Sequence, residues 1–368
     1  MKRFFLAAFA IAVIASCTKN EVNEVTANDQ ITFQTVVGPN TKALIDGPTY
    51  ETTDPAFGTV AYYNATGTTF PTSAALYIPE SMVSHPSTYW STATPYYWPK
   101  NGSLTFFSYS PYNELEATMT CDLTDGLTLT NWDVDANQDV DVMVADVQTN
   151  QTANVLHGGY TGVPTIFRHK LSQIVDITFK TDKDYANNDG TSGAPFVAGD
   201  KQFFINYVKI NKLEQTGTYT SGINVSNSQL GTWELPNPAA YDHNYDWFTE
   251  TASCNTEFKS PDATSANNKR SYLLVMPQTY VNFTGSQTAA DVSNVEVKYT
   301  IRTYTDASHY SDDVVTAHVS MYDIFSTSSN ALAMNKMVTI NFTIGVNQIY
   351  WAPSVAEWGT QTGAATIN

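Results

Sequence analysis

"VEVKYTIRTY", residues 295–304, alternates apolar and polar side chains with a period of two. The odd-numbered positions from Val295 to Ile301 are apolar, and the even-numbered positions between them are charged or hydroxylic. Successive side chains of a β-strand point to opposite faces, so this pattern predicts a half-buried strand. "VTINFTIGV", residues 338–346, repeats the pattern with Val338, Ile340 and Phe342 on one face.

Similar short runs recur along the chain, separated by Ser, Thr, Asn, Gly and Pro. They predict strands at 31–37, 59–63, 104–109, 140–145, 174–180, 203–213, 272–276, 295–304 and 338–346. The 22 Tyr, 18 Phe and 7 Trp residues also favour strands. Helical spacing is expected only over residues 328–337, for about two turns. Short alternating strands without amphipathic helices between them predict an all-β fold of antiparallel sandwiches.

The N-terminus has the layout of a secretory signal. Met1-Lys2-Arg3 is basic, residues 4–15 are apolar, and Ser16 precedes Cys17. The apolar run is too short to span a bilayer as a helix. The tetrad ending at Cys17 resembles a bacterial lipobox, so we predict that residues 1–16 are removed and Cys17 is lipidated. The alternative is an ordinary cleaved signal with an incidental cysteine.

Composition limits the classes of function. The net charge of −17 argues against nucleic-acid binding, which requires clustered Lys and Arg. Of the three cysteines, Cys121 and Cys254 lie beyond the signal, and we expect two buried thiols, with one disulfide as the alternative. The length suggests two domains. Residues 17–30 are polar and lack aromatics, which predicts a flexible tether, and the stretch 148–164 has the composition of a linker. We therefore expect an N-terminal β-sandwich at 31–155 and a C-terminal β-sandwich at 160–368.

One acidic stretch has the spacing of a metal loop. Its oxygen-bearing side chains alternate as in a calcium loop, at Asp133, Asp135, Asn137 and Asp139. Gln138 stands where the sharp turn needs glycine, and Val144 where a bidentate glutamate belongs. This makes a weak calcium candidate, and the alternative is a solvated loop leading into the strand at 140–145.

The sequence carries no catalytic signature. Its six histidines form no HxxxH or HxH pair, and no GxSxG, P-loop or GxGxxG motif occurs. We therefore predict no enzymatic activity and no cofactor, and a structural role for His169.

Nine aromatic residues lie between Tyr89 and Tyr112. Trp90, Tyr97 and Trp98 could form a platform for a sugar, as in a glycan-binding module. We favour the alternative of a packed sandwich edge, with Lys100-Asn101-Gly102 as the turn between two strands.

Five segments together resemble the fimbrillins, the lipoprotein-derived subunits of type V pili of Bacteroidales. They are "YYWPKNGSLTFFSYSPY" (96–112), "DVDVMVA" (139–145), "FRHKLSQIVDITF" (167–179), "YLLVMPQ" (272–278) and "IYWAPSVAEWG" (349–359). The resemblance implies two transthyretin-like β-sandwich domains, a surface-exposed lipoprotein of the outer membrane, a place in a fimbrium, and partners that are other copies or related pilus subunits. A host or bacterial surface ligand is a further implied partner.

The resemblance also implies a mode of assembly. A protease cuts after the first strand, and the emptied groove accepts a C-terminal strand from another subunit, which is β-strand addition. The departing strand would present Ile31, Phe33, Thr35 and Val37. The donor segment, within residues 346–368, would present Ile349, Trp351, Val355 and Trp358.

The expected cleavage position departs from the family pattern. Stalk subunits are usually cut after arginine, whereas Lys42 followed by Ala43 stands here, and arginine occurs only at positions 3, 168, 270 and 302. Either another protease cuts at Lys42, or the lipid is retained. If the chain is cut, it would be a stalk or tip subunit, which we favour. If the lipid is retained, it would be a pilus anchor or another non-polymerising surface lipoprotein.

Overall fold

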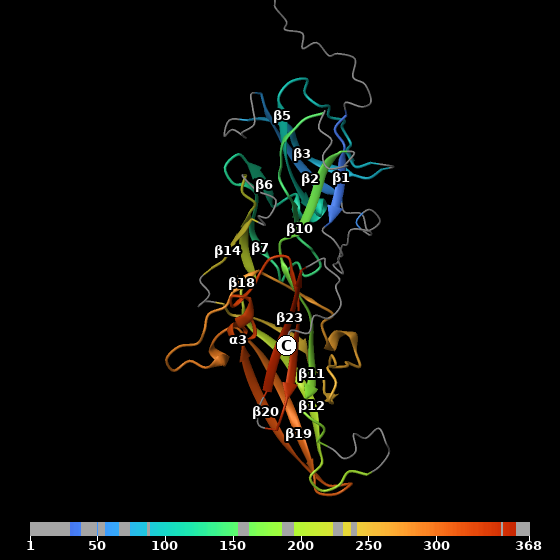
Figure 1. Cartoon of the computed structure of the whole chain (residues 1–368), viewed down its shortest axis with the longest axis vertical. Helices are drawn as coiled ribbons and strands as arrows, with labels where there is room; N and C mark the ends of the chain where they lie inside the picture. Colours follow the sequence, from blue (N-terminus) through green and yellow to red (C-terminus); the bar gives the residue numbers. More distant parts are fainter. Residues whose placement is uncertain are drawn as a thin grey trace, which may run out of the picture.

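The computed structural model of the chain describes residues 30–37, 50, 56–65, 74–86, 89–153, 162–185, 195–223, 231–236, 241–346 and 349–357. Within these ranges the chain consists mostly of β-strands joined by turns and short helical segments. The predicted all-β fold is confirmed. The body is elongated, with the blue and teal N-terminal strands at one end and the orange and red strands at the other (Figure 1).

An eight-stranded sheet forms the N-terminal end. Its strands are β1 Phe33–Val37, β2 Phe57–Asn64, β3 Ala75–Ser84, β4 Ser91–Thr92, β5 Ser103–Ser110, β8 Met143–Ala145, β9 Gln148–Gln151 and β10 Val163–His169. The order is β1-β10-β8-β5-β2-β3-β4, and β9 pairs with β5. Every residue of β5 is buried, because both of its faces are covered. Leu104 and Phe106 belong to one hydrophobic core, and Phe107 and Tyr109 to a second.

The second core lies between this sheet and a four-stranded sheet. That sheet comprises β6 Met119–Asp122, β7 Gly126–Asp133, β13 Thr216–Thr220 and β14 Thr232–Glu234. Its order is β14-β13-β7-β6, so β7 and β13, from opposite sides of the boundary expected at 155–160, are direct neighbours. Trp132 of β7 and Tyr219 of β13 are both buried in this core.

Two further sheets enclose the C-terminal core. One has the order β17-β11-β22-β23, and the other the order β15-β12-β19-β20 with β16 paired to β12. Their bounds are β11 Ser172–Thr181, β12 Lys201–Leu213, β15 His243–Phe248, β16 Ala252–Cys254, β17 Leu273–Val275, β19 Asn294–Tyr304, β20 Tyr310–Ser320, β22 Lys336–Ile344 and β23 Ile349–Glu357. Val295, Val297, Tyr299 and Ile301 of β19 are all buried in this core, as their alternation predicted.

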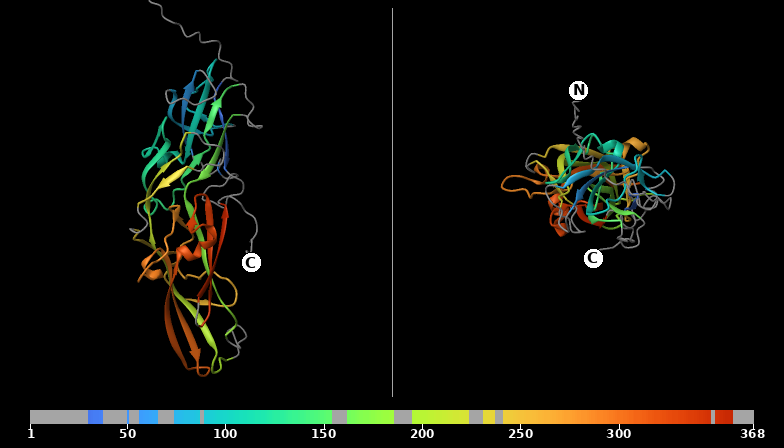
Figure 2. Two further views of the ribbon diagram at one scale, coloured as in Figure 1. Left: turned by 60° about the vertical axis from the view of Figure 1, so that its left-hand side comes forward. Right: turned by 90° about the horizontal axis from the view of Figure 1, so that it is seen from above.

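The remaining elements are short. They are the strand pair β18 Gln278–Thr279 with β21 Ala331–Leu332, the helices α2 Tyr112–Leu115 and α3 Met321–Ile324, and the 3-10 turns η3 Ala266–Asn268, η4 Ala289–Asp291 and η5 Ser326–Ser328. None of the helices in the described ranges is long and apolar enough to cross a membrane. Figure 2 shows that the N-terminal and C-terminal sheets follow one another along the long axis.

The prediction of a helix at 328–337 is wrong. This stretch contains the end of η5, strand β21, a turn and the start of β22. Ser329, Asn330 and Asn335 have φ values of 57°, 55° and 61°. A right-handed helix cannot continue through left-handed residues, so these three positions produce turns instead.

Candidate assembly site

The first strand is bound along both of its edges. On one edge β1 pairs in parallel with β10, from Phe33 opposite Val163 to Val37 opposite Phe167. On the other edge, the backbone N–H of Ile31 donates to the Tyr96 carbonyl at 2.8 Å, and that of Phe33 to the Trp90 carbonyl at 3.0 Å. Backbone hydrogen bonds therefore hold the strand between β10 and the segment 90–96.

Two apolar side chains anchor this strand in the core that contains Leu104 and Phe106, which we call the N-terminal core. Ile31 is 1% exposed and Phe33 is 3% exposed. The Phe33 ring makes edge contacts with Phe57 and Phe106, at centroid distances of 5.5 and 5.7 Å. Thr35, predicted on the same face, is half-buried. Ile31 and Phe33 thus fill a space lined by aromatic rings from β2 and β5.

A glycine permits the close approach of the first strand to β10. A Cβ atom on Gly162 would lie 2.7 Å from the carbonyl oxygen of Thr32, which is closer than nonbonded atoms approach. That same carbonyl accepts a hydrogen bond of 2.8 Å from the N–H of Val163. A side chain at position 162 would therefore displace the strand.

Several predicted positions cannot be placed. Cys17, nearly all of the tether 17–30, Lys42, Ala43 and Trp358 lie outside the described residues, and so does the side chain of Val37.

The C-terminal strand β23 is the last strand of the sheet β17-β11-β22-β23 of the same chain. β23 pairs antiparallel with β22, with Ile349 opposite Ile344 and Val355 opposite Val338. Ile349 and Val355 pack against the C-terminal core as partly buried residues. Tyr350 and Trp351, by contrast, are 51% and 38% exposed. This strand is an edge strand that presents two large aromatic side chains to solvent.

The aromatic segment is mostly interior. Trp90 and Phe106 are buried in the N-terminal core, where Trp90 packs on Phe57. Tyr97 and Trp98 are half-buried, and Tyr89 is exposed. Since Trp90 is buried, the three residues considered for a sugar platform do not share an open surface, and the arrangement is that of a packed edge.

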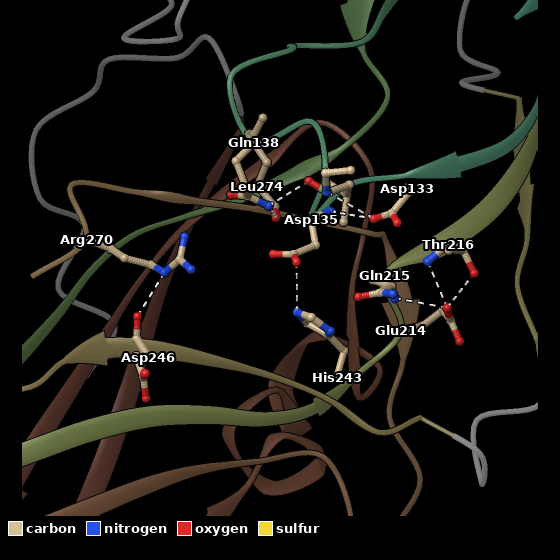
Figure 3. Close-up of polar contacts among 12 residues, drawn as sticks. Asp133, Asp135, Gln138, Glu214, Gln215, Thr216, His243, Asp246, Arg270 and Leu274 are labelled. Carbon is tan, nitrogen blue, oxygen red and sulfur yellow. Dashed lines mark hydrogen bonds and ion pairs between the residues drawn. The ribbon is translucent and has the colours of Figure 1, made fainter. Parts of the chain in front are cut away.

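The acidic loop after β7 is held by its own hydrogen bonds. The Asp133 carboxylate accepts from the backbone N–H groups of Asp135 and Ala136 at 3.0 and 3.1 Å. The Asn137 side chain donates to the Asp133 carbonyl at 2.7 Å. Figure 3 shows Asp133 and Asp135 directed to different partners. Within the described ranges, no three or more His, Cys, Asp or Glu residues are grouped so as to hold a metal ion.

Three consecutive basic residues at and just after the end of β10 lie near two aspartates, a contact that the sequence did not reveal. Arg168 makes a bidentate ion pair with Asp146, at 2.7 and 2.8 Å. His169 is buried, with Nδ1 2.9 Å from Asp141 Oδ1. Burial lowers the pKa of Lys170 to about 7, against the opposing attraction of Asp146. Asp141 and Asp146 flank the strand β8 that pairs with β10, so pairing of the strands brings the opposite charges together.

Cys121 and Cys254 are free, half-buried thiols. Burial raises the pKa of each to about 12, so neither is a reactive thiolate at neutral pH.

A family model described as fimbrillin-like matches residues 41–358. The chain belongs to the fimbrillin-like family. No match was found among curated proteins.

Two solved structures are similar to this chain. A fimbrial protein from Bacteroides vulgatus is similar over 90% of this fimbrillin-like chain and 99% of its own, with 15% identity and a TM-score of 0.56. The tip fimbrial protein Mfa3 from Porphyromonas gingivalis, solved with a C-terminal truncation, is similar over 88% of this chain and 99% of its own, with 12% identity and a TM-score of 0.35. The first similarity shows a shared fold.

Proposed function

We propose that this protein is a structural and adhesive subunit of a type V fimbria that assembles by proteolysis-triggered donor-strand exchange. One observation carries the proposal: Ile31 and Phe33 fill the N-terminal core. The strand that bears them precedes Lys42, so a cut after Lys42 would separate it from the rest of the chain. The role is mechanical and requires no catalytic group.

Loss of the first strand would create a strong acceptor. It would leave the edge of β10 and the Tyr96 and Trp90 carbonyls without their backbone partners. It would also expose Phe57 and Phe106, and burial of such a side chain contributes about 1.5–3 kcal/mol. An incoming strand restores both the hydrogen bonds and the apolar contacts, so strand addition is favourable.

The proposed donor is the C-terminal segment 346–368 of another copy or of a related subunit. To leave the sheet of its own chain, it must lose the backbone hydrogen bonds between β23 and β22. Tyr350 and Trp351 are exposed in the unassembled chain, and burying their rings in a neighbour's groove offsets part of the loss.

Export would precede assembly. The proposed route takes the chain to the outer membrane as a lipoprotein anchored at Cys17, followed by a cut between Lys42 and Ala43. The domain boundaries at 31–155 and 160–368 are part of this proposal, with the shared sheet of β7 and β13 as the link between the two parts.

The test compares the full chain with the chain starting at Ala43, both at high concentration in non-denaturing and SDS gels. We expect ladders from the trimmed chain and a monomer from the full chain. A trimmed chain that also lacks residues 346–368 is the matched control and should stay monomeric. A folded trimmed chain that remains strictly monomeric would exclude the stalk role.

The second candidate is a non-polymerising surface lipoprotein, either a pilus anchor or a glycan-binding module. Lysine in place of the usual arginine favours it, because an arginine-specific protease has no target near the first strand. N-terminal sequencing of the protein from cells separates the two. A start at Ala43 supports the fimbrial subunit, and a blocked, lipidated Cys17 supports the anchor.

A further inference from the structure

A cavity of about 650 Å³ lies between the acidic loop after β7 on one side and the end of β15 with residues 266–272 on the other. This volume is within the usual range for small-molecule sites. Its wall carries three carboxylates, from Asp135, Asp139 and Asp246, and two cations, from Lys269 and Arg270. None of the residues of β1 or β23 lines it, so the proposed assembly leaves it without a role.

The acidic side of the cavity is attached to strands β17 and β15. Gln138 accepts from the Leu274 N–H at 3.0 Å and donates to the Leu274 carbonyl at 2.8 Å. Asp135 Oδ2 lies 3.3 Å from His243 Nε2. Figure 3 shows both links. A site whose walls are already fixed loses little entropy when a ligand binds.

The basic side is fixed as well. The Arg270 side chain donates from Nε to the Asp246 carbonyl at 2.8 Å, and its guanidinium lies 5.4 Å from the centre of the Tyr245 ring. Its backbone N–H donates to the Trp247 carbonyl at 2.9 Å. Among the described residues, no protein acceptor is bonded to the Nη groups of Arg270, so up to four N–H donors remain available to a ligand.

The mixture of charges selects the chemistry of the ligand. Lys269 Nζ lies 3.6 Å from Asp176 Oδ1, and Asp246 Oδ1 lies 3.5 Å from Lys209 Nζ, so these two charges are already paired. An anion attracted to Arg270 is repelled by Asp135 and Asp139, and a cation attracted to these carboxylates is repelled by Arg270. The described residues also lack a grouping that could hold a metal ion. A neutral molecule rich in hydroxyl groups fits both sides, since each hydroxyl donates to a carboxylate and accepts from a cation or an amide.

We propose that this cavity is a saccharide-binding site for a neutral glycan, engaging about one or two sugar rings. Arg270 donates to ring and hydroxyl oxygens, and Asp135 and Asp139 accept from hydroxyl groups. Tyr272, half-buried on the wall, supplies an aromatic surface for a ring face. Such a site would give the subunit a ligand independent of strand exchange.

The experiment titrates the full chain with maltose, lactose and N,N′-diacetylchitobiose by calorimetry and saturation-transfer NMR, with sulfate and glutamate as charged probes. We expect at least one disaccharide to bind and the charged probes not to bind. If no disaccharide binds below about 10 mM, or if sulfate binds in their place, the proposal is overturned.

Variants locate the binding. Arg270→Lys keeps the charge but removes the fork of donors, and Asp139→Ala removes an exposed acceptor; each should weaken binding about tenfold, the effect of one lost charged hydrogen bond. Asp262→Ala, an exposed aspartate outside the cavity, is the control and should bind normally. Circular dichroism confirms that each variant is folded. Unchanged binding by both cavity variants would place the saccharide elsewhere and overturn the assignment.

Discussion

Phe33 is the residue on which the packing of the first strand depends. It is buried and touches two other phenylalanine rings. Phe33→Ala should lower the free energy of unfolding of the full chain by about 3–5 kcal/mol, because it removes apolar contacts and leaves a cavity. Urea unfolding measures the change. Leu76→Ala, at a position 56% exposed, is the control and should cost about 0.5 kcal/mol or less. Equal effects of the two would contradict the plug role of Phe33.

Lys170 gives the protein a pH-dependent stability. Its pKa is lowered to about 7 in the folded chain, whereas an unfolded lysine titrates near 10.4. Between these values the unfolded chain binds more protons, so this group makes stability rise with pH from about 7 to about 10, by at most about 1.4 kcal/mol per pH unit.

Lys170→Met tests this. The unfolding free energy of the wild-type protein minus that of the variant should rise between pH 7 and pH 9, as measured by urea denaturation. The backbone contacts of residue 170 with Val142 and Trp233 do not depend on its side chain. A flat difference over this range would show that the lysine is not held neutral.

Among the strands, β22 and β23 differ in how deeply their aromatic side chains are buried. Phe342 of β22 is fully buried and stacks on Phe179 at 5.4 Å, whereas Trp351 of β23 is exposed. Phe342→Ala should destabilise the chain by about 3–5 kcal/mol. Trp351→Ala should change its stability by about 1 kcal/mol or less, yet reduce ladder formation by the trimmed chain. Normal ladders from the Trp351 variant would remove this residue from the donor set.

The acidic loop after β7 is attached to strand β17. Gln138 joins it to Leu274 by two hydrogen bonds. Gln138→Ala should lower the unfolding free energy by about 1–3 kcal/mol, because the Leu274 groups lose their partner. Thermal and urea unfolding check this, with the exposed neighbour Asp139→Ala as the control. If both substitutions have the same small effect, the loop is not anchored through Gln138.

For the whole molecule, net charge should affect the rate of the proposed assembly. The chain carries −17 at neutral pH, so approaching subunits repel one another. Screening shortens the range of this repulsion from about 30 Å at 0.01 M salt to about 8 Å at 0.15 M. Ladder formation by the trimmed chain should therefore be several-fold faster at the higher salt, as timed gel samples would show. A rate independent of salt would mean that strand release, and not encounter, limits assembly.

Alternation along the sequence was enough to predict the β class, and each of the nine predicted runs overlaps a strand, whereas β3, β7 and β20 were not predicted. Alternation such as that of Val295 to Ile301 reports which side chains face a core, and this depends only on local order along the chain. The sequence also suggested the fimbrillin-like family, from several ordered segments. It misplaced a helix at 328–337, because apolar spacing does not reveal left-handed turn residues such as Ser329, Asn330 and Asn335.

The tertiary structure alone decided which strands meet and what lies between them. The parallel pairing of β1 with β10, the close approach at Gly162 and the joining of β7 to β13 bring together residues far apart in the sequence. The cavity beside Arg270 has the same origin, since Asp135 and Asp139 lie more than a hundred positions before the other charged residues of its wall. Local periodicity specifies the faces of a strand, but only packing of the folded chain specifies its neighbours.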